Sequence, residues 1–213
     1  LDQQATYDAL EFYRSMLELC PPGATGYSWG EMVTSFVSGA TATGLYAGRV
    51  LANVTAQNPQ IANSITCALY PRMSRDVPAW TYNDFPCVCI PSDASNKAEA
   101  KLFAASLFDP VGYIPQLHAA PGHVLPVLET IAGSPAYRDN EVIARYPQEI
   151  DLMASAAAQG YNLGFETSAH EPNAKAGEII ASNAIAEMVQ QVVLNGENPQ
   201  VVVGNTAARL EEI

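Results

Sequence analysis

The chain has 213 residues and a formal net charge of −12, because 22 acidic side chains stand against only 10 basic ones. Nucleic acids and anionic membrane surfaces attract clustered Lys and Arg, so this balance argues against both as partners. Hydrophobic residues make up 48% of the chain and its mean hydropathy is +0.02, which predicts a soluble globular protein. No run of about 18 apolar residues is present, so no transmembrane helix is predicted.

Helical periodicity dominates the chain and is interrupted by three short strand candidates. Helices are predicted, in chain order, over residues 5–19, 30–37, 97–107, 139–159, 174–194 and 199–212. Strands are predicted at 42–46, 64–69 and 87–90. Since strands alternate with helices, we expect the α/β class, helix-rich and with few strands.

The stretch between residues 26 and 54 is the most informative part of the sequence, GYSWGEMVTSFVSGATATGLYAGRVLANV. An aromatic turn with Tyr27 and Trp29 leads into a short amphipathic helix, and an apolar run follows. That run ends in Tyr46, Gly48 and Arg49, where a small-residue turn places a ring and a guanidinium at the end of a predicted strand. Strand ends that face a crevice are where open α/β folds bind ligands, so this turn is a candidate binding site.

The order of these features resembles the extracytoplasmic solute-binding proteins of ABC importers, in their sugar-binding branch, the maltose-binding-protein-like family 1. The series continues in order with NKAEA at 96–100, YIPQLHAAPGHVLPV at 113–127, SPAY at 134–137 and NGENP at 195–199. In the family, the stretch that 113–127 resembles ends a helix at a Pro-Gly turn. No single piece is a strict signature, and the collinear series carries the resemblance.

The resemblance implies a periplasmic-binding-protein-like fold, of which this chain is the C-terminal half. Residues 1–83 and 127–213 are expected in the second lobe, 84–118 in a segment that returns to the first lobe, and 119–126 in the hinge crossing. It further implies a protein of the periplasm, or of the cell exterior on a lipid anchor, that is monomeric when complete. Such a protein closes on a small solute, a sugar or sugar derivative, and delivers it to an ABC permease in the membrane. Because a clamshell site needs two walls, the chain alone is expected to bind weakly or not at all.

Sugars are held by aromatic rings that stack on their C–H faces and by polar side chains that bond their hydroxyl groups. Side chains of these kinds, with one glycine of the turn, form the candidate ligand-binding set: Tyr27, Trp29, Tyr46, Gly48, Arg49, Trp80, Tyr161, Phe165 and Glu166. Family members often carry an aromatic ring at the position that Arg49 resembles, so simple stacking is not expected there. A guanidinium can instead grip hydroxyls, a carboxylate or a phosphate, or it can pair with a nearby acid.

The candidates also have a purely structural interpretation. Trp29 would cap the core beneath the following helix, Tyr46 would be a core residue, and Arg49 would pair with an acid. The chain would then be a non-catalytic α/β interaction domain without a small-molecule ligand. Such a domain would expose a contiguous apolar patch in place of a site lined by these residues.

The sequence contains none of the usual catalytic signatures. We find no Gly-x-Ser-x-Gly elbow, no His-Glu-x-x-His pair, no phosphate-binding glycine loop and no dinucleotide fingerprint. The three histidines lack metal-ligand spacing, so no enzyme activity, metal site or cofactor is predicted. Cys87 and Cys89 are expected to be small buried hydrophobes, and a disulfide between Cys20 and Cys67 is left open.

Overall fold

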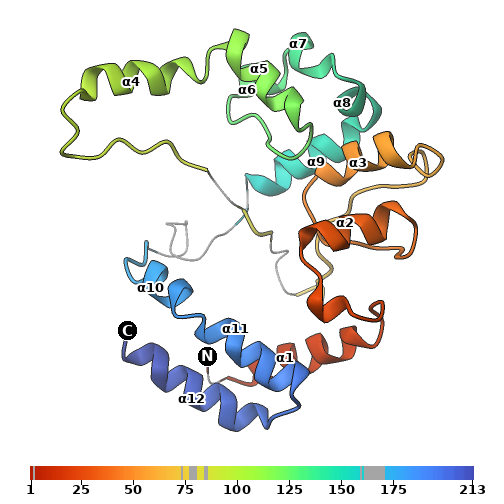
Figure 1. Ribbon diagram of the computed structural model, residues 1–213, viewed down its shortest axis with the longest axis vertical. Helices are drawn as coiled ribbons and strands as arrows, with labels where there is room; N and C mark the ends of the chain where they lie inside the picture. The colour runs from red at the N-terminus through yellow and green to blue at the C-terminus, as the bar shows by residue number, and fades with distance from the viewer. Residues whose placement is uncertain (2, 73, 77–80, 84–85, 159, 161–170) are drawn as a thin grey trace. The chain divides into compact units, whose positions relative to one another are not determined.

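The computed structural model describes residues 1, 3–72, 74–76, 81–83, 86–158, 160 and 171–213 (Figure 1). The chain divides into two compact units, one formed by Leu1–Tyr27 with Tyr161–Ile213 and the other by Ser28–Gly160. The assignments of residues 1–83 and 127–213 to a second lobe and of 119–126 to a hinge crossing stay predictions. The assignment of 84–118 to a first lobe stays a prediction.

Helices account for 56% of the chain, which confirms that the fold is helix-rich. The three strand predictions are wrong, because 42–46, 64–69 and 87–90 are irregular chain with no ladder in the described residues. A strand needs a neighbouring strand to pair its N–H and C=O groups, and an apolar composition cannot supply one. Ala42–Tyr46 runs instead past a helix, since a Cβ added at Gly44 would lie 3.0 Å from the Met32 sulfur.

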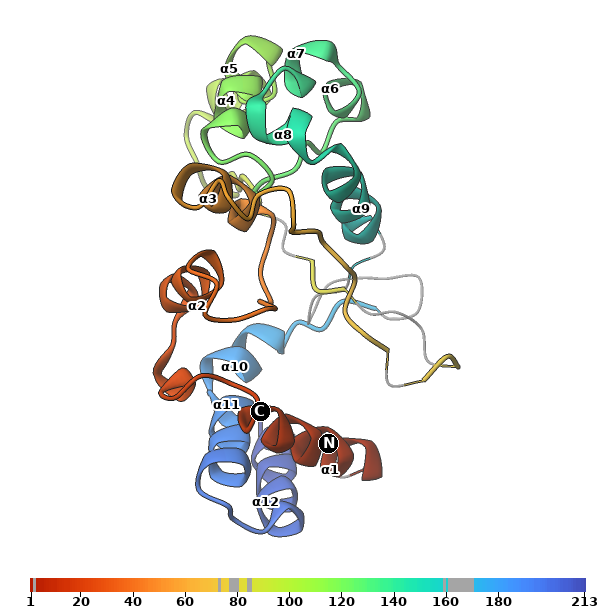
Figure 2. The ribbon, with the colours of Figure 1, turned by 90° about the vertical axis from the view of Figure 1, so that its right-hand side faces the viewer.

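The first unit is a small helical bundle. It contains α1 (Gln4–Leu17), a 3-10 turn (Ala24–Gly26), α10 (Ala176–Ala181), α11 (Ala184–Val189), a π-helical segment (Gln190–Leu194) and α12 (Pro199–Glu211). Helices α1, α11 and α12 lie side by side in both ribbon views (Figures 1 and 2). Their facing apolar side chains form one buried core: Leu10, Met188, Val192, Val193, Val202 and Val203.

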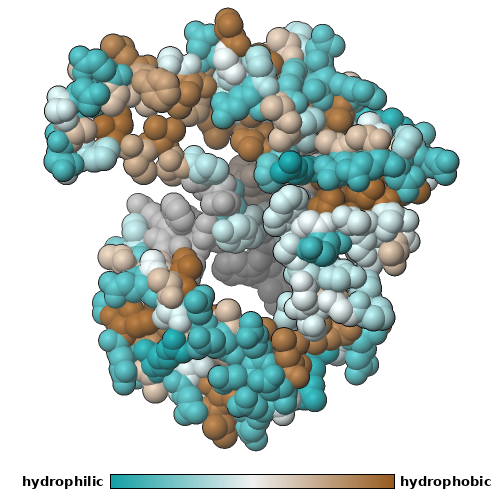
Figure 3. Space-filling model, viewed as in Figure 1, coloured by the Kyte–Doolittle hydropathy of each residue, from teal (hydrophilic) through white to brown (hydrophobic). Residues whose placement is uncertain are grey.

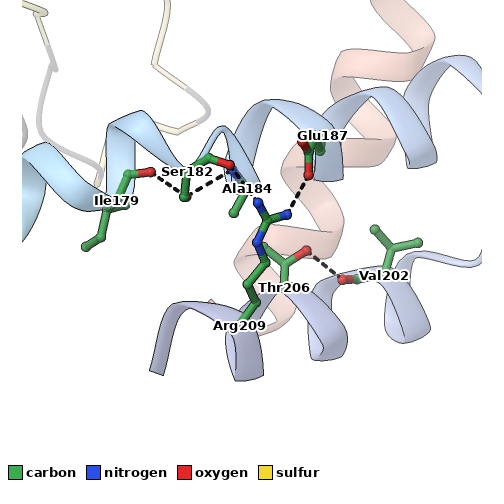
Figure 4. Close-up of polar contacts among 7 residues, drawn as sticks. All are labelled: Ile179, Ser182, Ala184, Glu187, Val202, Thr206 and Arg209. Atoms are coloured by element: carbon green, nitrogen blue, oxygen red, sulfur yellow. Dashed lines mark hydrogen bonds and ion pairs between the residues drawn. The ribbon is translucent and has the colours of Figure 1, made fainter. Parts of the chain in front are cut away.

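The single helix predicted over 174–194 is broken after α10, where Asn183 adopts a left-handed conformation with φ 54°. Arg209 of α12 stabilises this break (Figure 4). Its guanidinium donates a 2.7 Å hydrogen bond to the Ser182 carbonyl and forms a 2.5 Å ion pair with Glu187. Arg209 therefore satisfies a carbonyl at the end of α10 that has no partner within the helix.

The second unit holds α2 (Trp29–Val37), α3 (Arg49–Gln57), α4 (Lys97–Ser106), α5 (Pro110–Ala119), α6 (Glu129–Ala132), α7 (Pro135–Arg138), α8 (Glu141–Arg145) and α9 (Pro147–Ala157). Helix α3 packs on α2 through Val33, Val37 and Val54, and on α8 through Leu51 and Val142. The helix predicted over 139–159 is two helices, because Pro147 begins α9 and cannot continue α8. The expected end of a helix before a Pro-Gly turn is confirmed at Ala119.

Helix α4 differs from the rest of the second unit because none of its side chains is buried. Leu102 is 73% exposed and Phe103 65%, and apolar residues gather over this helix in the space-filling view (Figure 3). The residues after 86 that precede it are also open to solvent. Cys87 and Cys89 are exposed thiols, so their expected burial is wrong.

Candidate binding site

Four side chains of the second unit form a surface group that we call the aromatic cluster: Trp29, Tyr46, Arg49 and His123. The Trp29 and Tyr46 ring centroids are 6.5 Å apart with an interplanar angle of 12°, and those of Tyr46 and His123 are 6.3 Å apart at 19°. The Arg49 guanidinium carbon lies 5.6 Å from the centre of the Trp29 ring. Trp29 is 58% exposed and Tyr46 37%, while His123 is exposed and Arg49 half-buried.

The start of α2 positions Trp29. Ser28 is the N-cap, Trp29 the first helical residue, and Glu31 reaches back to accept a 2.9 Å hydrogen bond from the Ser28 backbone N–H. The Ser28 hydroxyl donates to the same carboxylate oxygen. This is a capping box, in which the N-cap and the third helical residue satisfy each other's polar groups. The hydrogen bond from the Ser28 side chain, followed by backbone hydrogen bonds, lowers the pKa of the Glu31 carboxyl.

The end of α2 turns the chain back toward Trp29. Gly39 adopts φ 79°, and two backbone bonds close the helix: Gly39 N–H to the Phe36 carbonyl, and Ala40 N–H to the Ser35 carbonyl. This paired pattern is the Schellman motif, and it requires a left-handed residue that glycine supplies most readily. The chain then passes over Met32 and Phe36 at Gly44, which brings Tyr46 beside Trp29.

Two buried glycines bring His123 into the cluster. A Cβ built on Gly48 would lie 2.5 Å from the Gly122 carbonyl oxygen and 2.5 Å from the Met153 terminal methyl carbon. The backbones of the α3 start and of the loop after α5 therefore approach more closely than any side chain permits. Gly122 itself has φ 76°, a conformation that favours glycine. Since His123 follows Gly122 directly and Tyr46 precedes Gly48 by two residues, this contact sets the spacing of their rings.

The structure brings three of the predicted residues together, namely Trp29, Tyr46 and Arg49. Tyr46 is 37% exposed, so its interpretation as a core residue is wrong, and Trp29, the alternative cap of the core, is 58% exposed at the start of α2. Gly48 is buried and serves the packing against Gly122, and Tyr27 belongs to the other unit, where it ends the 3-10 turn as an exposed ring. The remaining candidates lie outside the described residues: Trp80, Tyr161, Phe165 and Glu166.

Sequence reasoning set His123 aside because it looked only for metal-ligand spacing. A usable signal was present in Pro121-Gly122-His123, where a glycine permits close approach to another backbone and the histidine follows at once. Gly48 in the turn between Tyr46 and Arg49 was the matching partner. Nothing local in either segment indicates that these two glycines meet.

The aromatic cluster has the chemistry of a binding site. Its rings can stack on C–H groups, and its guanidinium, imidazole, hydroxyl and indole N–H can form hydrogen bonds. Within the described ranges, no three His, Cys, Asp or Glu side chains lie close enough to hold a metal ion. None of the described helices combines the length and apolar composition needed to cross a bilayer.

A comparison with models of known protein families finds no match, and a comparison with curated proteins finds none either. The resemblance to solute-binding proteins therefore rests on the collinear series in the sequence alone.

The capping box predicts a pH dependence that Trp29 reports. The folded-state pKa of Glu31 is lowered from 4.5. The ionised carboxylate therefore stabilises the folded chain above pH 4.5, and this stabilisation is lost as the pH falls through the folded-state pKa. We expect the start of α2 to fray in acid and the fluorescence of Trp29 to change there, measured in a Trp80→Phe background that leaves Trp29 as the single tryptophan. Glu31→Gln should remove the acid transition, because the amide does not titrate. An identical transition in that variant would contradict the assignment.

Proposed function

We propose that the chain binds a small polar solute, a sugar or sugar derivative, as part of a solute-binding protein of an ABC importer. The supporting observation is that the aromatic cluster presents two exposed aromatic rings beside a guanidinium. The finer fold, the C-terminal half of a periplasmic-binding-protein-like α/β protein, belongs to this proposal, as do the periplasmic or lipid-anchored location and the membrane permease as partner.

The physical reason lies in the exposure of Trp29 and Tyr46. A tryptophan that leaves 58% of its surface in water gives up much of the hydrophobic stabilisation that burial would provide. The capping box and the Schellman motif nevertheless hold it beside a second, nearly parallel ring. Rings in this arrangement suit the flat C–H face of a pyranose, and polar groups at their edge suit its substituents.

The test is the tryptophan fluorescence of the unmodified chain during titration with sugars, polyols and sugar acids, repeated with Trp80→Phe, in which Trp29 is the single tryptophan. We expect a saturable change with Kd of about 1 mM, or about −4 kcal/mol, because one wall of a clamshell makes only part of the contacts. Tyr46→Ala should weaken binding about tenfold, by loss of one stacking ring. Tyr13→Ala, which removes an exposed ring on α1, is the control and should leave Kd unchanged. Absence of any saturable change would contradict the proposal.

A second candidate function is supported by the exposed face of α4. Leu102 and Phe103 expose large apolar side chains on this helix, as Val111 does on α5 at 85% exposed, and exposed apolar surface marks protein-protein contacts. On this alternative the chain is an interaction domain, and small solutes leave the Trp29 fluorescence unchanged. Leu102→Ser with Phe103→Ser would then abolish association with a partner while the solute titration stays flat.

A further inference from the structure

Resting on the proposed function, we infer that the solute is anionic: a saccharide that carries a carboxylate or phosphate, with Arg49 binding the charged group beside the rings. The hydrogen-bonding groups of the aromatic cluster are the Arg49 guanidinium, the His123 imidazole, the Tyr46 hydroxyl and the Trp29 N–H, and no carboxylate or amide side chain belongs to it. A guanidinium has five N–H donors and no acceptor and an indole only donates, whereas a neutral imidazole and a phenolic hydroxyl each combine a donor with an acceptor, so donors outnumber acceptors in the cluster. Neutral sugar hydroxyls both donate and accept, whereas a carboxylate or phosphate accepts only, so the composition of the cluster favours the anion.

The surroundings of Arg49 support the same conclusion. Two other arginines in the described residues form ion pairs, Arg138 with Asp151 at 2.7 Å and Arg209 with Glu187 at 2.5 Å. Arg49 makes neither an ion pair nor a hydrogen bond with any described residue. Its guanidinium instead makes a cation–π contact with the ring of Trp29. The chain carries 22 acidic side chains, and a half-buried guanidinium that forms no ion pair with any of the described ones is available to an anion from solution.

Stacking on Trp29 also prepares Arg49 for this role. A guanidinium above an indole face gains a cation–π interaction while its in-plane N–H groups stay open. Those N–H groups form a planar fork that matches the two oxygens of a carboxylate or phosphate. Since the ring limits the rotamers of Arg49 before binding, less conformational entropy is lost when the anion binds.

Matched probes test the charge preference: D-glucuronate and D-galacturonate, glucose 6-phosphate and galactose 6-phosphate, and D-glucose and D-galactose, with inorganic phosphate as the non-sugar anion. Binding to the full, unmodified chain is followed by tryptophan fluorescence, and Trp80→Phe is measured beside it to isolate the signal of Trp29. We expect at least one charged sugar to bind about tenfold or more tightly than its neutral counterpart, as one charge-assisted hydrogen-bonded pair provides. The uronates and the sugar phosphates distinguish a carboxylate from a phosphate ligand. Added salt should weaken the charged sugar selectively.

Substitutions at Arg49 test whether this side chain causes the preference for charged sugars. Arg49→Gln should abolish the preference for the charged sugar while the neutral sugar still binds, and Arg49→Lys should keep only part of it, because an ammonium lacks the planar fork. Arg145→Gln is the control, since that guanidinium bonds to Asn63 away from the cluster. Equal affinity for charged and neutral sugars, or an unchanged preference in Arg49→Gln, would overturn the inference and leave the proposed function standing. Inorganic phosphate binding as tightly as the sugar phosphates would also overturn it. If no saccharide of any charge binds, the proposed function fails as well.

Discussion

Gly48→Ala is expected to destabilise the unit Ser28–Gly160 by about 1–3 kcal/mol, the usual cost of overpacking an interior contact. The added methyl group would lie 2.5 Å from the Gly122 carbonyl oxygen, so backbone must move, and a shift of Met153 alone does not relieve the clash. The backbone at Gly48 has φ −62°, which alanine adopts readily, so the effect is steric. Because this contact sets the distance between Tyr46 and His123, the aromatic cluster should be disturbed as well.

Urea unfolding followed by Trp29 fluorescence measures the loss, and solute affinity measures the disturbance of the cluster. Gly112→Ala is the matched control, because it adds the same methyl group within α5 where nothing lies within 4 Å. Alanine has the higher helix propensity there, so this control should keep or raise the free energy of unfolding by up to about 1 kcal/mol. An unfolding midpoint of Gly48→Ala equal to that of the unmodified chain would show that the two backbones do not meet as described.

Tyr137→Ala should lower the free energy of unfolding of the same unit by about 3–5 kcal/mol, as is usual for truncating a buried aromatic ring. Tyr137 is 1% exposed and packs among Leu117, Ile143 and Ile150. Its ring also stacks on His118, with centroids 6.0 Å apart. Truncation therefore removes the contacts that join α5, α7 and α9.

Tyr137→Phe separates the ring from the hydroxyl. The Tyr137 hydroxyl is buried with no hydrogen-bond partner among the described residues, so its removal should raise the free energy of unfolding by about 1 kcal/mol.

Burial also raises the pKa of Tyr137 above its usual 10, so the folded state holds this proton more tightly than the unfolded state does. The protonated Tyr137 therefore contributes to the free energy of unfolding below pH 10, and this contribution is lost as the pH rises through its folded-state pKa. Tyr137→Phe should lack that alkaline loss in unfolding experiments. A destabilised phenylalanine variant would mean that the hydroxyl has a partner.

Much of the helical structure could be predicted because its signals are local. Ser28 with Glu31 begins α2, Gly39 ends it, and Asn198 begins α12 by accepting from two backbone N–H groups of the first turn. Each of these acts within one helical turn, where bonding geometry leaves few alternatives. The predictions failed where a local break was overlooked, as at Pro147 and Asn183.

The candidate site could be predicted only in part. Trp29, Tyr46 and Arg49 were singled out because aromatic and cationic side chains beside small turns suit ligand binding, and the structure groups them. The reasoning that grouped them was mistaken in one respect, since it placed Tyr46 and Arg49 at the end of a strand, whereas Tyr46 lies in irregular chain and Arg49 begins α3. His123 was missed because its place depends on a contact between two distant segments.

The sequence by itself determined the helix-rich character, the ends of α2 and the acidic charge, because each depends on residues near one another or on composition alone. Only the tertiary structure decided that residues 42–46 are not a strand and that Tyr46, Arg49 and His123 share one surface with Trp29. A strand exists only with a partner, and the backbones of Gly48 and Gly122 touch only once the helices around them have packed.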